Sequence, residues 1–383
     1  MHIAFNGWFW DQPYTGSGQY IRALIPALHT IASAMRLSLI VPEHVTITGD
    51  IGAEVIRVPL PFGGNIGKVL FEQRIFPHLV GQIKADLAHV PYWGGPLRSP
   101  APIVVTIHDV IPLSMPVYQG GWGPKLYTGL AIAGAKGAVH IITDSEFSRQ
   151  EIVARIGVPA DLVTAIPLAV GSDLHPRIGA ERDPEIREKY HLPDSYTLYL
   201  GGFDVRKNLR ALLAAYTYVG PSAGDDYPLV LAGKEPGAWG SPRFPDLKAD
   251  IQRIGLGQWV RWIGPVDEAD KPGVYRMARA SVFPSRYEGF GLGPLESMAC
   301  GTATIAADAS SIPEVVGDGA YLVDPDDSRA MGGAIIATLI QDDLRESLRN
   351  HGLARASNFS WNRTARETLA IFQKVIGRRV PSC

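Results

Sequence analysis

The chain has 383 residues, of which 46% are hydrophobic and 19% charged, and this composition excludes an intrinsically disordered protein. A formal net charge of −2 argues against a nucleic-acid-binding protein, and two cysteines, Cys300 and Cys383, provide neither a disulfide framework nor a metal-ligand spacing. Neither an apolar run of the ~18 residues that span a bilayer nor a cleavable leader in MHIAFNGWFW is evident, so we expect a cytoplasmic protein.

A chain of this length is long for one hydrophobic core, so two domains are expected. In the first part of the chain, short apolar runs predict strands at Ile3–Asn6, Leu37–Val41, Val55–Val58, Leu87–Val90, Ile103–Ile107, Val139–Thr143 and Val163–Ile166. Helical patterns intervene near Lys68–Ile83, Trp122–Ala133 and Glu146–Ile156, and a first one is opened by Thr15-Gly16-Ser17-Gly18 and runs to about Ala34. Such alternation predicts a parallel sheet that helices cover on both faces.

The segment from Gly171 to Pro184 is polar and proline-containing, which is typical of a linker between domains. Beyond it, strands are predicted at Thr197–Leu200, Leu229–Leu231, Val260–Ile263, Ser281–Phe283, Ala303–Ala306 and Tyr321–Val323. Helices are predicted near Asn208–Tyr218, Pro245–Ile254, Lys271–Ala278, Leu295–Cys300, Arg329–Leu339 and Trp361–Ile376. The sequence therefore predicts a second doubly wound domain after the linker.

The stretch Ser281–Gly301 joins a strand, a glycine-rich turn and a helix N-terminus, with Gly301 as the expected helix stop. This combination can bind an anionic group on backbone N–H groups and the helix dipole. Glu288 is expected at the entrance of the turn and Glu296 in the first helical turn. Each carboxylate could accept hydrogen bonds from a sugar diol, or Glu296 could merely favour the helix N-terminus while Glu288 is solvated.

The segment EGFGLGPLE, with the ACGTATIAADASSIPEVVGDGAYLVDPDD that follows it, resembles the signature of retaining nucleotide-sugar glycosyltransferases of family 4. The two glutamates match the family's pair, which has seven residues between its members, whereas Gly293 stands where many members have proline. The resemblance implies the α/β GT-B fold, in which two Rossmann-like doubly wound domains face a cleft. We expect an acceptor-side domain at 1–170, a linker at 171–184, a nucleotide-sugar domain at 185–360 and a helix at 361–383 that packs back on the first domain.

Two further segments resemble phosphate-facing loops of this family. Gly16-Ser17-Gly18 resembles the glycine loop of the first domain; as a dinucleotide fingerprint it is weak, because Ile21 occupies the third glycine position. Gly201–Asn208 resembles the phosphate clamp, in which Arg206 and Lys207 would neutralise the departing diphosphate. The alternatives are an ordinary helix-initiating turn and a solvated cation pair, although cations at a helix N-terminus oppose its dipole.

The segment Thr106–Pro112 resembles a family segment whose histidine lies beside the reacting sugar, which implies that role for His108. A structural histidine after a strand is the alternative. In the next such loop, either Asp144 or Ser145 is expected to cap a helix.

No metal is expected. Asp324-Pro325-Asp326 matches a D-x-D pattern, but the sequence is also ordinary turn chemistry after a strand. The resemblance points the same way, because GT-B enzymes generally do not need the metal.

The resemblance implies a hexosyltransferase that moves a hexose, mannose being favoured, from a nucleotide diphosphate sugar to a glycan or lipid-linked glycan in cell-envelope or exopolysaccharide synthesis. It favours GDP-mannose over a UDP-sugar and needs no other cofactor. It implies catalytic roles for the motif residues His108, Glu288, Arg206 and Lys207, and donor binding by Gly16, Gly18, Gly202, Phe290, Gly291, Leu292 and Glu296. Peripheral contact with the inner face of a membrane and the oligomeric state stay open.

Three alternative functions are weighed against this one. A glycoside hydrolase could use two glutamates but needs no diphosphate clamp. A nicotinamide-dependent oxidoreductase is opposed by Ile21. A nucleotide-sugar-binding protein without transferase activity is left open, although loss of one glutamate would have favoured it and both Glu288 and Glu296 are present.

Overall fold

The computed structural model describes residues 1–377 and divides the chain into two compact units. The first unit comprises Met1–Leu168 together with the chain from Ser360 onward, and the second comprises Ala169–Phe359. Cys383 lies outside the described residues.

The first unit is built on a seven-stranded sheet whose order is β3-β2-β1-β4-β5-β6-β7 and whose neighbouring strands run parallel. Its strands are β1 (His2–Asn6), β2 (Arg36–Pro42), β3 (Glu54–Val58), β4 (Leu87–Val90), β5 (Ile103–Thr106), β6 (His140–Thr143) and β7 (Val163–Ala165). The central strands β1 and β4 are buried along their whole length, which explains their continuous apolar runs.

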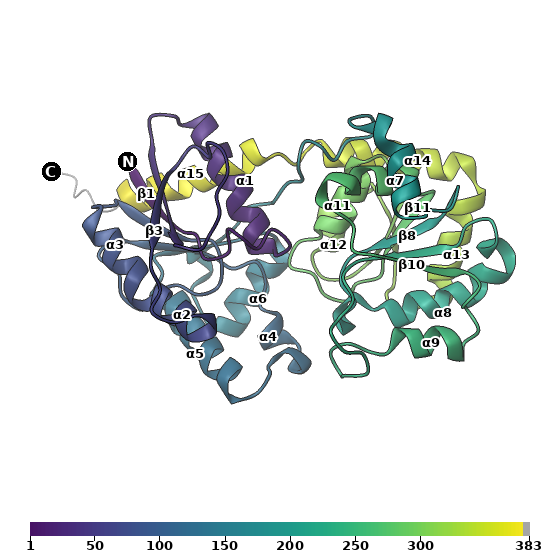
Figure 1. The fold of residues 1–383 in the computed structure, drawn as a ribbon, viewed down its shortest axis with the longest axis horizontal. Coiled ribbons are helices and arrows are strands. Elements are labelled where there is room, and N and C mark those ends of the chain that lie inside the picture. Colours follow the sequence, from purple (N-terminus) through teal and green to yellow (C-terminus); the bar gives the residue numbers. More distant parts are fainter. Residues whose placement is uncertain (378–383) are drawn as a thin grey trace. The chain divides into compact units, whose positions relative to one another are not determined.

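Helices cover both faces of this sheet (Figure 1). They are α1 (Gly16–Ile31), α2 (Gly64–Leu70), the π-helical segment η1 (Phe71–Ile75), α3 (Phe76–Gln82), α4 (Ile111–Ser114), α5 (Trp122–Gly137), α6 (Glu146–Ile156) and α15 (Trp361–Gly377), with short 3₁₀ turns η2 (Pro116–Tyr118) and η3 (Ala160–Leu162). Helix α15 packs along α1, and its Phe372 ring meets the Phe5 ring of β1 edge-on with centroids 6.3 Å apart. The last described helix thus completes the core of the first unit.

The second unit has a six-stranded sheet of order β10-β9-β8-β11-β12-β13, again with parallel neighbours. Its strands are β8 (Thr197–Leu200), β9 (Leu229–Ala232), β10 (Val260–Gly264), β11 (Ala280–Phe283), β12 (Thr304–Ala307) and β13 (Tyr321–Val323). Each strand of both sheets overlaps one predicted from the sequence, because every one is a short apolar run bounded by turn residues.

The helices of the second unit form two layers, with α8, α9 and α13 on one face of the sheet (Figure 1). They are α7 (Asp183–Lys189), α8 (Leu209–Val219), α9 (Leu247–Arg253), α10 (Lys271–Met277), α11 (Leu292–Ala299), α12 (Ile312–Val316), α13 (Ser328–Ile340) and α14 (Asp342–Ala356), with short segments η4 (Ala180–Arg182), η5 (Val205–Lys207), η6 (Gly220–Gly224) and η7 (Glu268–Asp270). Both Rossmann-like sheets therefore have the two-sided cover that the sequence predicts.

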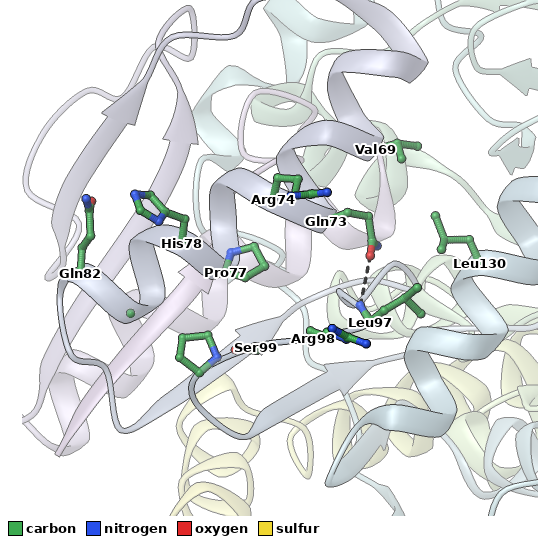
Figure 2. Close-up of a pocket in the computed structure, with 12 residues that line it drawn as sticks. Val69, Gln73, Arg74, Pro77, His78, Gln82, Leu97, Arg98, Ser99 and Leu130 are labelled. Carbon is green, nitrogen blue, oxygen red and sulfur yellow. Dashed lines mark hydrogen bonds between the residues drawn. The ribbon is translucent and has the colours of Figure 1, made fainter.

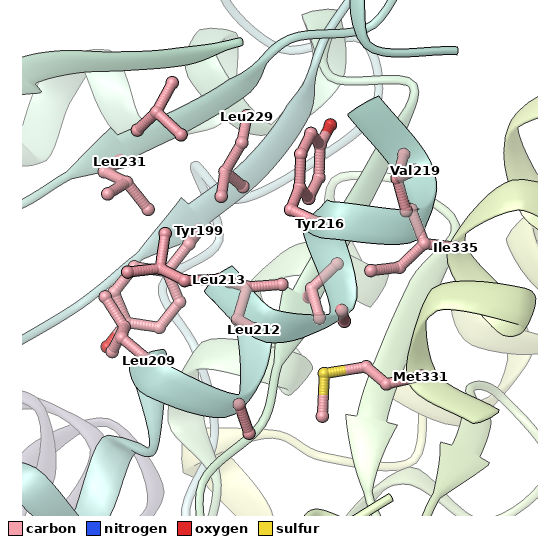
Figure 3. Packing of buried hydrophobic residues seen from close by; sticks show 14 of the residues in the cluster. Tyr199, Leu209, Leu212, Leu213, Tyr216, Val219, Leu229, Leu231, Met331 and Ile335 are labelled. Carbon is pink, nitrogen blue, oxygen red and sulfur yellow. The ribbon is translucent and has the colours of Figure 1, made fainter. Parts of the chain in front are cut away.

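A hydrophobic core packs α8 and α13 against β8, the first strand of the second unit (Figure 3). Leu212 and Tyr216 lie four residues apart on α8, and Met331 and Ile335 lie four apart on α13; none exposes more than a trace of its surface. Burying each such side chain contributes roughly 1.5–3 kcal/mol. Since these helices hold β8 from one face, the loop that follows β8 is anchored as well.

The structure corrects the sequence prediction in several helical regions, and the short helices α4 and α12 were not predicted. Helix α14 was not predicted, because its surface is mostly polar and it buries only Leu348, Gly352 and Ala356. Helix α7 begins at Asp183, inside the segment expected to be a linker, with Pro184 in its first turn. A proline that reads as a breaker in sequence is here part of a helix start.

Candidate functional site

Two loops of the second unit meet at the carboxyl edge of its sheet. Strands β8 and β11 are neighbours at the centre, and the strand order reverses between them. Arg206 and Lys207 follow β8 on η5, whereas Glu288 follows β11. In open α/β sheets such a reversal point is where ligands bind.

Glu288 is held by both cations. The Lys207 Nζ donates to Glu288 Oε1 at 2.5 Å, and the Arg206 Nη1 donates to Glu288 Oε2 at 2.6 Å. The three side chains are only 14–20% exposed. Burial by itself would raise the pKa of Glu288, but Lys207 and Arg206 outweigh burial and hold the pKa of this carboxyl at about 2.

Arg206 has further partners in the same loops. Its Nε lies 3.2 Å from Asp204 Oδ1, and its Nη1 also donates to the carbonyl of Tyr287 at 3.1 Å. The cluster therefore presents two cations whose charge two carboxylates already balance. An incoming diphosphate would meet preorganised cations, but it would compete with Glu288 for them.

The glycine turn is fixed by a serine that sequence reasoning missed. Ser311 Oγ donates to the carbonyls of Glu288 at 2.9 Å and Phe290 at 2.6 Å. Gly291 has φ of 122°, a conformation that favours glycine. The Phe290 ring is buried, so only the backbone of that residue remains for a ligand. The signal in the sequence was the serine pair of ADASSIPE, which follows β12.

Glu296 lies deeper in α11 than the sequence suggested. The helix begins at Leu292 rather than Leu295, which places Glu296 in its second turn. Tyr275 Oη donates to Glu296 Oε2 at 3.0 Å, and Lys271 Nζ lies 3.9 Å from Oε1. Burial raises the pKa of Glu296 above its ordinary value, against the opposing effects of Lys271 and Tyr275. The carboxylate is thus held by one neutral donor and one cation.

In the first unit, His108 is paired with a carboxylate. His108 follows β5 and Asp144 follows β6, and His108 Nδ1 lies 2.7 Å from Asp144 Oδ2. Burial opposes charge on His108, but the Asp144 carboxylate outweighs burial and raises the pKa of the imidazole. Ser145 is the cap of α6, because its hydroxyl accepts from Ser148 N at 3.0 Å. Of the two candidate caps, the serine caps and the aspartate orients the histidine.

The predicted glycines have different structural roles. Gly16 is the exposed first residue of α1, and a Cβ there would meet nothing within 4 Å. A Cβ on Gly18 would lie 2.1 Å from the carbonyl oxygen of Gln12, so close packing already requires this glycine. Gly202 is exposed, and its carbonyl accepts a hydrogen bond from Tyr199 Oη.

The family follows from the comparisons. A model of glycosyl transferases group 1 matches residues 182–355, and one of glycosyltransferase family 4 matches residues 14–174. The chain is 36% identical to O-antigen chain mannosyltransferase B of Escherichia coli over 70% of each protein. It is also 31% identical to the serotype-specific mannosyltransferase WbdA of Escherichia coli, over 71% of this chain and about a third, 33%, of that protein.

The chain belongs to glycosyltransferase family 4.

Solved structures give the same fold for this glycosyltransferase. Sucrose-phosphate synthase from Thermosynechococcus elongatus superposes with a TM-score of 0.76 at 22% identity, covering 99% of this chain and 100% of that one. Anabaena HepE in complex with UDP superposes with a TM-score of 0.71 at 19% identity, covering 98% and 100%. The predicted GT-B fold class is confirmed.

The two aspartates of the D-x-D pattern form contacts within and beside the turn that follows β13. Asp324 Oδ1 accepts from the backbone N–H of Asp326 at 2.8 Å, and the Asp326 carboxylate pairs with Arg286 at 2.6 Å. Among residues 1–377, no group of three or more His, Cys, Asp or Glu side chains is arranged to hold a metal ion. No helix in that part of the chain combines the length and the apolar character that crossing a bilayer requires.

Proposed function

We propose that this glycosyltransferase transfers mannose, with retention at the anomeric carbon, from GDP-mannose to a hydroxyl of a glycan. The observation that carries the proposal is the cluster of Arg206, Lys207 and Glu288 at the strand reversal of the second unit, beside the glycine turn. The relatives named as mannosyltransferases support mannose as the sugar. The Anabaena structure, which was solved in complex with UDP, keeps a UDP-sugar as the alternative donor.

In the proposed reaction the bond between the anomeric carbon and the diphosphate oxygen breaks, and its electron pair goes to that oxygen. Arg206 and Lys207 stabilise the leaving charge, together with the amides of Gly291 and Leu292 at the start of α11. Once the diphosphate takes the cations, the Glu288 carboxylate is released toward the sugar hydroxyls. The acceptor hydroxyl then bonds the anomeric carbon and passes its proton to the departing diphosphate oxygen.

Two other groups have binding roles in the proposal. Glu296, held by Tyr275 at 3.0 Å, accepts hydrogen bonds from the ribose hydroxyls of the nucleotide. His108, oriented by Asp144, which raises the pKa of the imidazole, hydrogen-bonds the sugar undergoing transfer through Nε2, which lies 3.2 Å from the Pro91 carbonyl oxygen in the unliganded protein. No protein-bound metal is required, since the charge of the diphosphate is met by side chains and backbone amides.

A thermal-shift panel tests the donor. GDP and GDP-mannose should raise the melting temperature more than UDP and UDP-glucose, because a tight ligand in excess stabilises the folded state by a few kcal/mol. Larger shifts with UDP compounds would show that the donor is a UDP-sugar and would leave the assignment as a glycosyltransferase unchanged. Release of free mannose from GDP-mannose in the presence of EDTA would separate a metal-independent transferase from a protein that only binds the nucleotide sugar.

For the acceptor we propose a lipid-linked glycan at the cytoplasmic face of a membrane. In the first unit, Trp122 and Leu126 lie four residues apart on α5 and are 82% and 62% exposed. A groove of about 1060 Å³ lies between η1–α3, the loop at 97–100 and the same helix α5 (Figure 2). Arg74, His78 and Arg98 line it, and the described residues around it include no carboxylate.

Apolar side chains next to unopposed cations suit an anionic bilayer surface. The protein should co-sediment with phosphatidylglycerol vesicles and not with phosphatidylcholine vesicles. The double variant Arg74→Gln with Arg98→Gln should weaken that binding several-fold, whereas Arg57→Gln, at an exposed position of β3, should not. Equal binding to both vesicle types would contradict the membrane contact.

A further inference from the structure

The first unit has a strand reversal of its own, and it holds an unassigned cluster. Strands β1 and β4 are neighbours in the sheet, and the chain proceeds outward from them in both directions. The segments after their carboxyl ends, beginning at Gly7 and Pro91, therefore border the crevice where open α/β sheets bind ligands. The proposed donor contacts of the first unit are Gly16, Gly18 and His108, whereas Arg206, Lys207, Glu288 and Glu296 belong to the second unit. The other side chains of this crevice have no proposed donor role.

A lysine side chain occupies an aromatic cage in this crevice. Lys68 Nζ lies 4.8 Å from the ring centroid of Phe9, 5.2 Å from that of Tyr92 and 4.7 Å from that of Tyr127. Only 19% of the lysine side chain is exposed. Three rings around one ammonium are a strong cation–π arrangement, since the effect grows when water is excluded.

The carboxylate of Glu72 forms an ion pair with Lys68. Its carboxylate is fully buried, with Oε1 3.7 Å from Lys68 Nζ, and Tyr127 Oη donates to it at 3.0 Å. A Cβ on Gly94 would lie 2.8 Å from that Tyr127 hydroxyl and 2.9 Å from Glu72 Oε1, so glycine is needed for the cage to close. Burial raises the pKa of Glu72 to about 7, against the influence of Lys68.

The local helix geometry places both charged side chains. Glu72 belongs to the π-helical segment η1, which interrupts the otherwise α-helical run from α2 to α3. Such bulges are frequent at functional sites because the extra residue redirects side chains. Residues 68 and 72 are four apart, so both side chains lie on one face of this run.

Hydrogen-bonding capacity is left unused around the lysine. The 3.7 Å from Lys68 to Glu72 exceeds a hydrogen-bond length, so this ion pair does not take up an ammonium N–H. Within residues 1–377, Asn6 Nδ2 and Tyr92 Oη are also buried without a hydrogen-bond partner, and Asn6 ends β1. Buried polar groups are normally satisfied, so Asn6 Nδ2 and Tyr92 Oη indicate a polar ligand or the water that replaces it.

The chemistry of the cluster favours a neutral polyol over an anion. The Lys68–Glu72 pair carries no net charge when both groups are ionised, which leaves little attraction for a phosphate. Partly exposed Phe9 and Tyr127 offer flat apolar faces, and Lys68 offers N–H donors to hydroxyl oxygens. Apolar faces beside hydroxyl-directed donors match a pyranose ring.

We propose that Lys68, caged by Phe9, Tyr92 and Tyr127 and paired with Glu72, binds a hydroxyl of the acceptor sugar. The assignment rests on the proposed function, because it takes the crevice of the first unit as the acceptor's side. Lys68 is a substrate-binding residue in this account, and Glu72 is a positioning residue that acts through it.

The test uses mannosides as probes. Transfer of mannose from GDP-mannose to a panel of methyl mannosides and mannobiosides gives the acceptor KM, and release of free mannose to water reports the donor half alone. Lys68→Met should raise the acceptor KM at least ten-fold while the donor KM and the hydrolysis rate stay within two-fold. Lys68→Arg, which keeps the cation, should recover most of the loss, and Lys136→Met, at an exposed position of α5, should match the wild type.

Each outcome decides the assignment. An unchanged acceptor KM in folded Lys68→Met, or a parallel loss of transfer and hydrolysis, would overturn it. If Lys68→Met does not fold, Tyr127→Phe, which removes the 3.0 Å hydrogen bond to Glu72, carries the test, and an unchanged acceptor KM in that variant would also overturn it. Saturation-transfer NMR that detects no mannoside on the wild type would rule out this ligand class, whereas absence of GDP-mannose binding would instead refute the proposed function.

Discussion

The side chains of Lys207 and Glu288, 81 residues apart in the chain, are joined by a hydrogen bond of 2.5 Å. Arg206 grips the other carboxylate oxygen, so the proposed phosphate cations and the proposed sugar-binding carboxylate neutralise one another in the unliganded protein. The same residues must separate when a diphosphate binds. Glu288 is thus a competitor for the donor's diphosphate as well as a proposed partner of its sugar.

Glu288→Gln should therefore have opposite effects on catalysis and on nucleotide binding. Loss of the carboxylate removes an oriented acceptor for the sugar hydroxyls, and kcat should fall ~10²-fold. The freed cations should bind GDP several-fold more tightly than in the wild type, by calorimetric titration. Glu346→Gln, at an exposed position of α14, serves as the control. Weaker GDP binding in Glu288→Gln would show that the carboxylate supports the cations rather than competing for them.

Asp144→Asn should change the protein's response to pH through His108. Asp144 raises the folded-state pKa of His108, so the stability it contributes is fully present below the ordinary value of ~6.5 and is lost as pH rises through the raised pKa. The variant should lose about 3 kcal/mol near pH 5 and less at a pH above the raised pKa of His108. Denaturant unfolding at both pH values measures this, with Asp161→Asn as an exposed control. A loss that does not depend on pH would point to packing instead of charge.

Glu296→Gln should mainly weaken recognition of the ribose. If Glu296 accepts hydrogen bonds from both hydroxyls, the donor KM should rise about ten-fold with little change in kcat, as expected for binding that is uniform along the reaction. The decisive measurement compares GDP with 2′,3′-dideoxy-GDP. The wild type should strongly prefer GDP, and the variant should lose most of that preference. Tyr275→Phe, which removes the 3.0 Å hydrogen bond to Glu296, should show a smaller loss in the same direction.

The two N-terminal glycines of α1 form a matched pair for stability. Gly18→Ala would place a Cβ 2.1 Å from the Gln12 carbonyl oxygen and should destabilise the fold by about 1–3 kcal/mol. Gly16→Ala meets nothing within 4 Å and should be neutral or slightly stabilising. Chemical denaturation compares them. If Gly16→Ala is stable yet raises the donor KM, the loop contacts the donor; equal stability of both variants would contradict the packing role of Gly18.

The sequence determined the strands and the motif chemistry, because both depend on local order. A buried parallel strand must be a short apolar run, and the structure has a strand at each predicted position. The resemblance of EGFGLGPLE and the segment after it to glycosyltransferase family 4 identified the family, as the comparisons confirm. Prediction from local sequence failed where the hydrophobic periodicity is weak. The polar helix α14 buries too few side chains to show an apolar stripe.

Only the tertiary structure decided which of these residues are partners. Sequence order says that β8 is followed by β9, but the sheet places β8 beside β11, and that neighbourhood brings Lys207 to Glu288. Because β5 and β6 are neighbours, His108 likewise lies within hydrogen-bond distance of Asp144. The sequence had suggested only a helix-capping role for Asp144. Partners of this kind depend on strand order and register, which the whole core sets. A charged residue by itself does not carry that information.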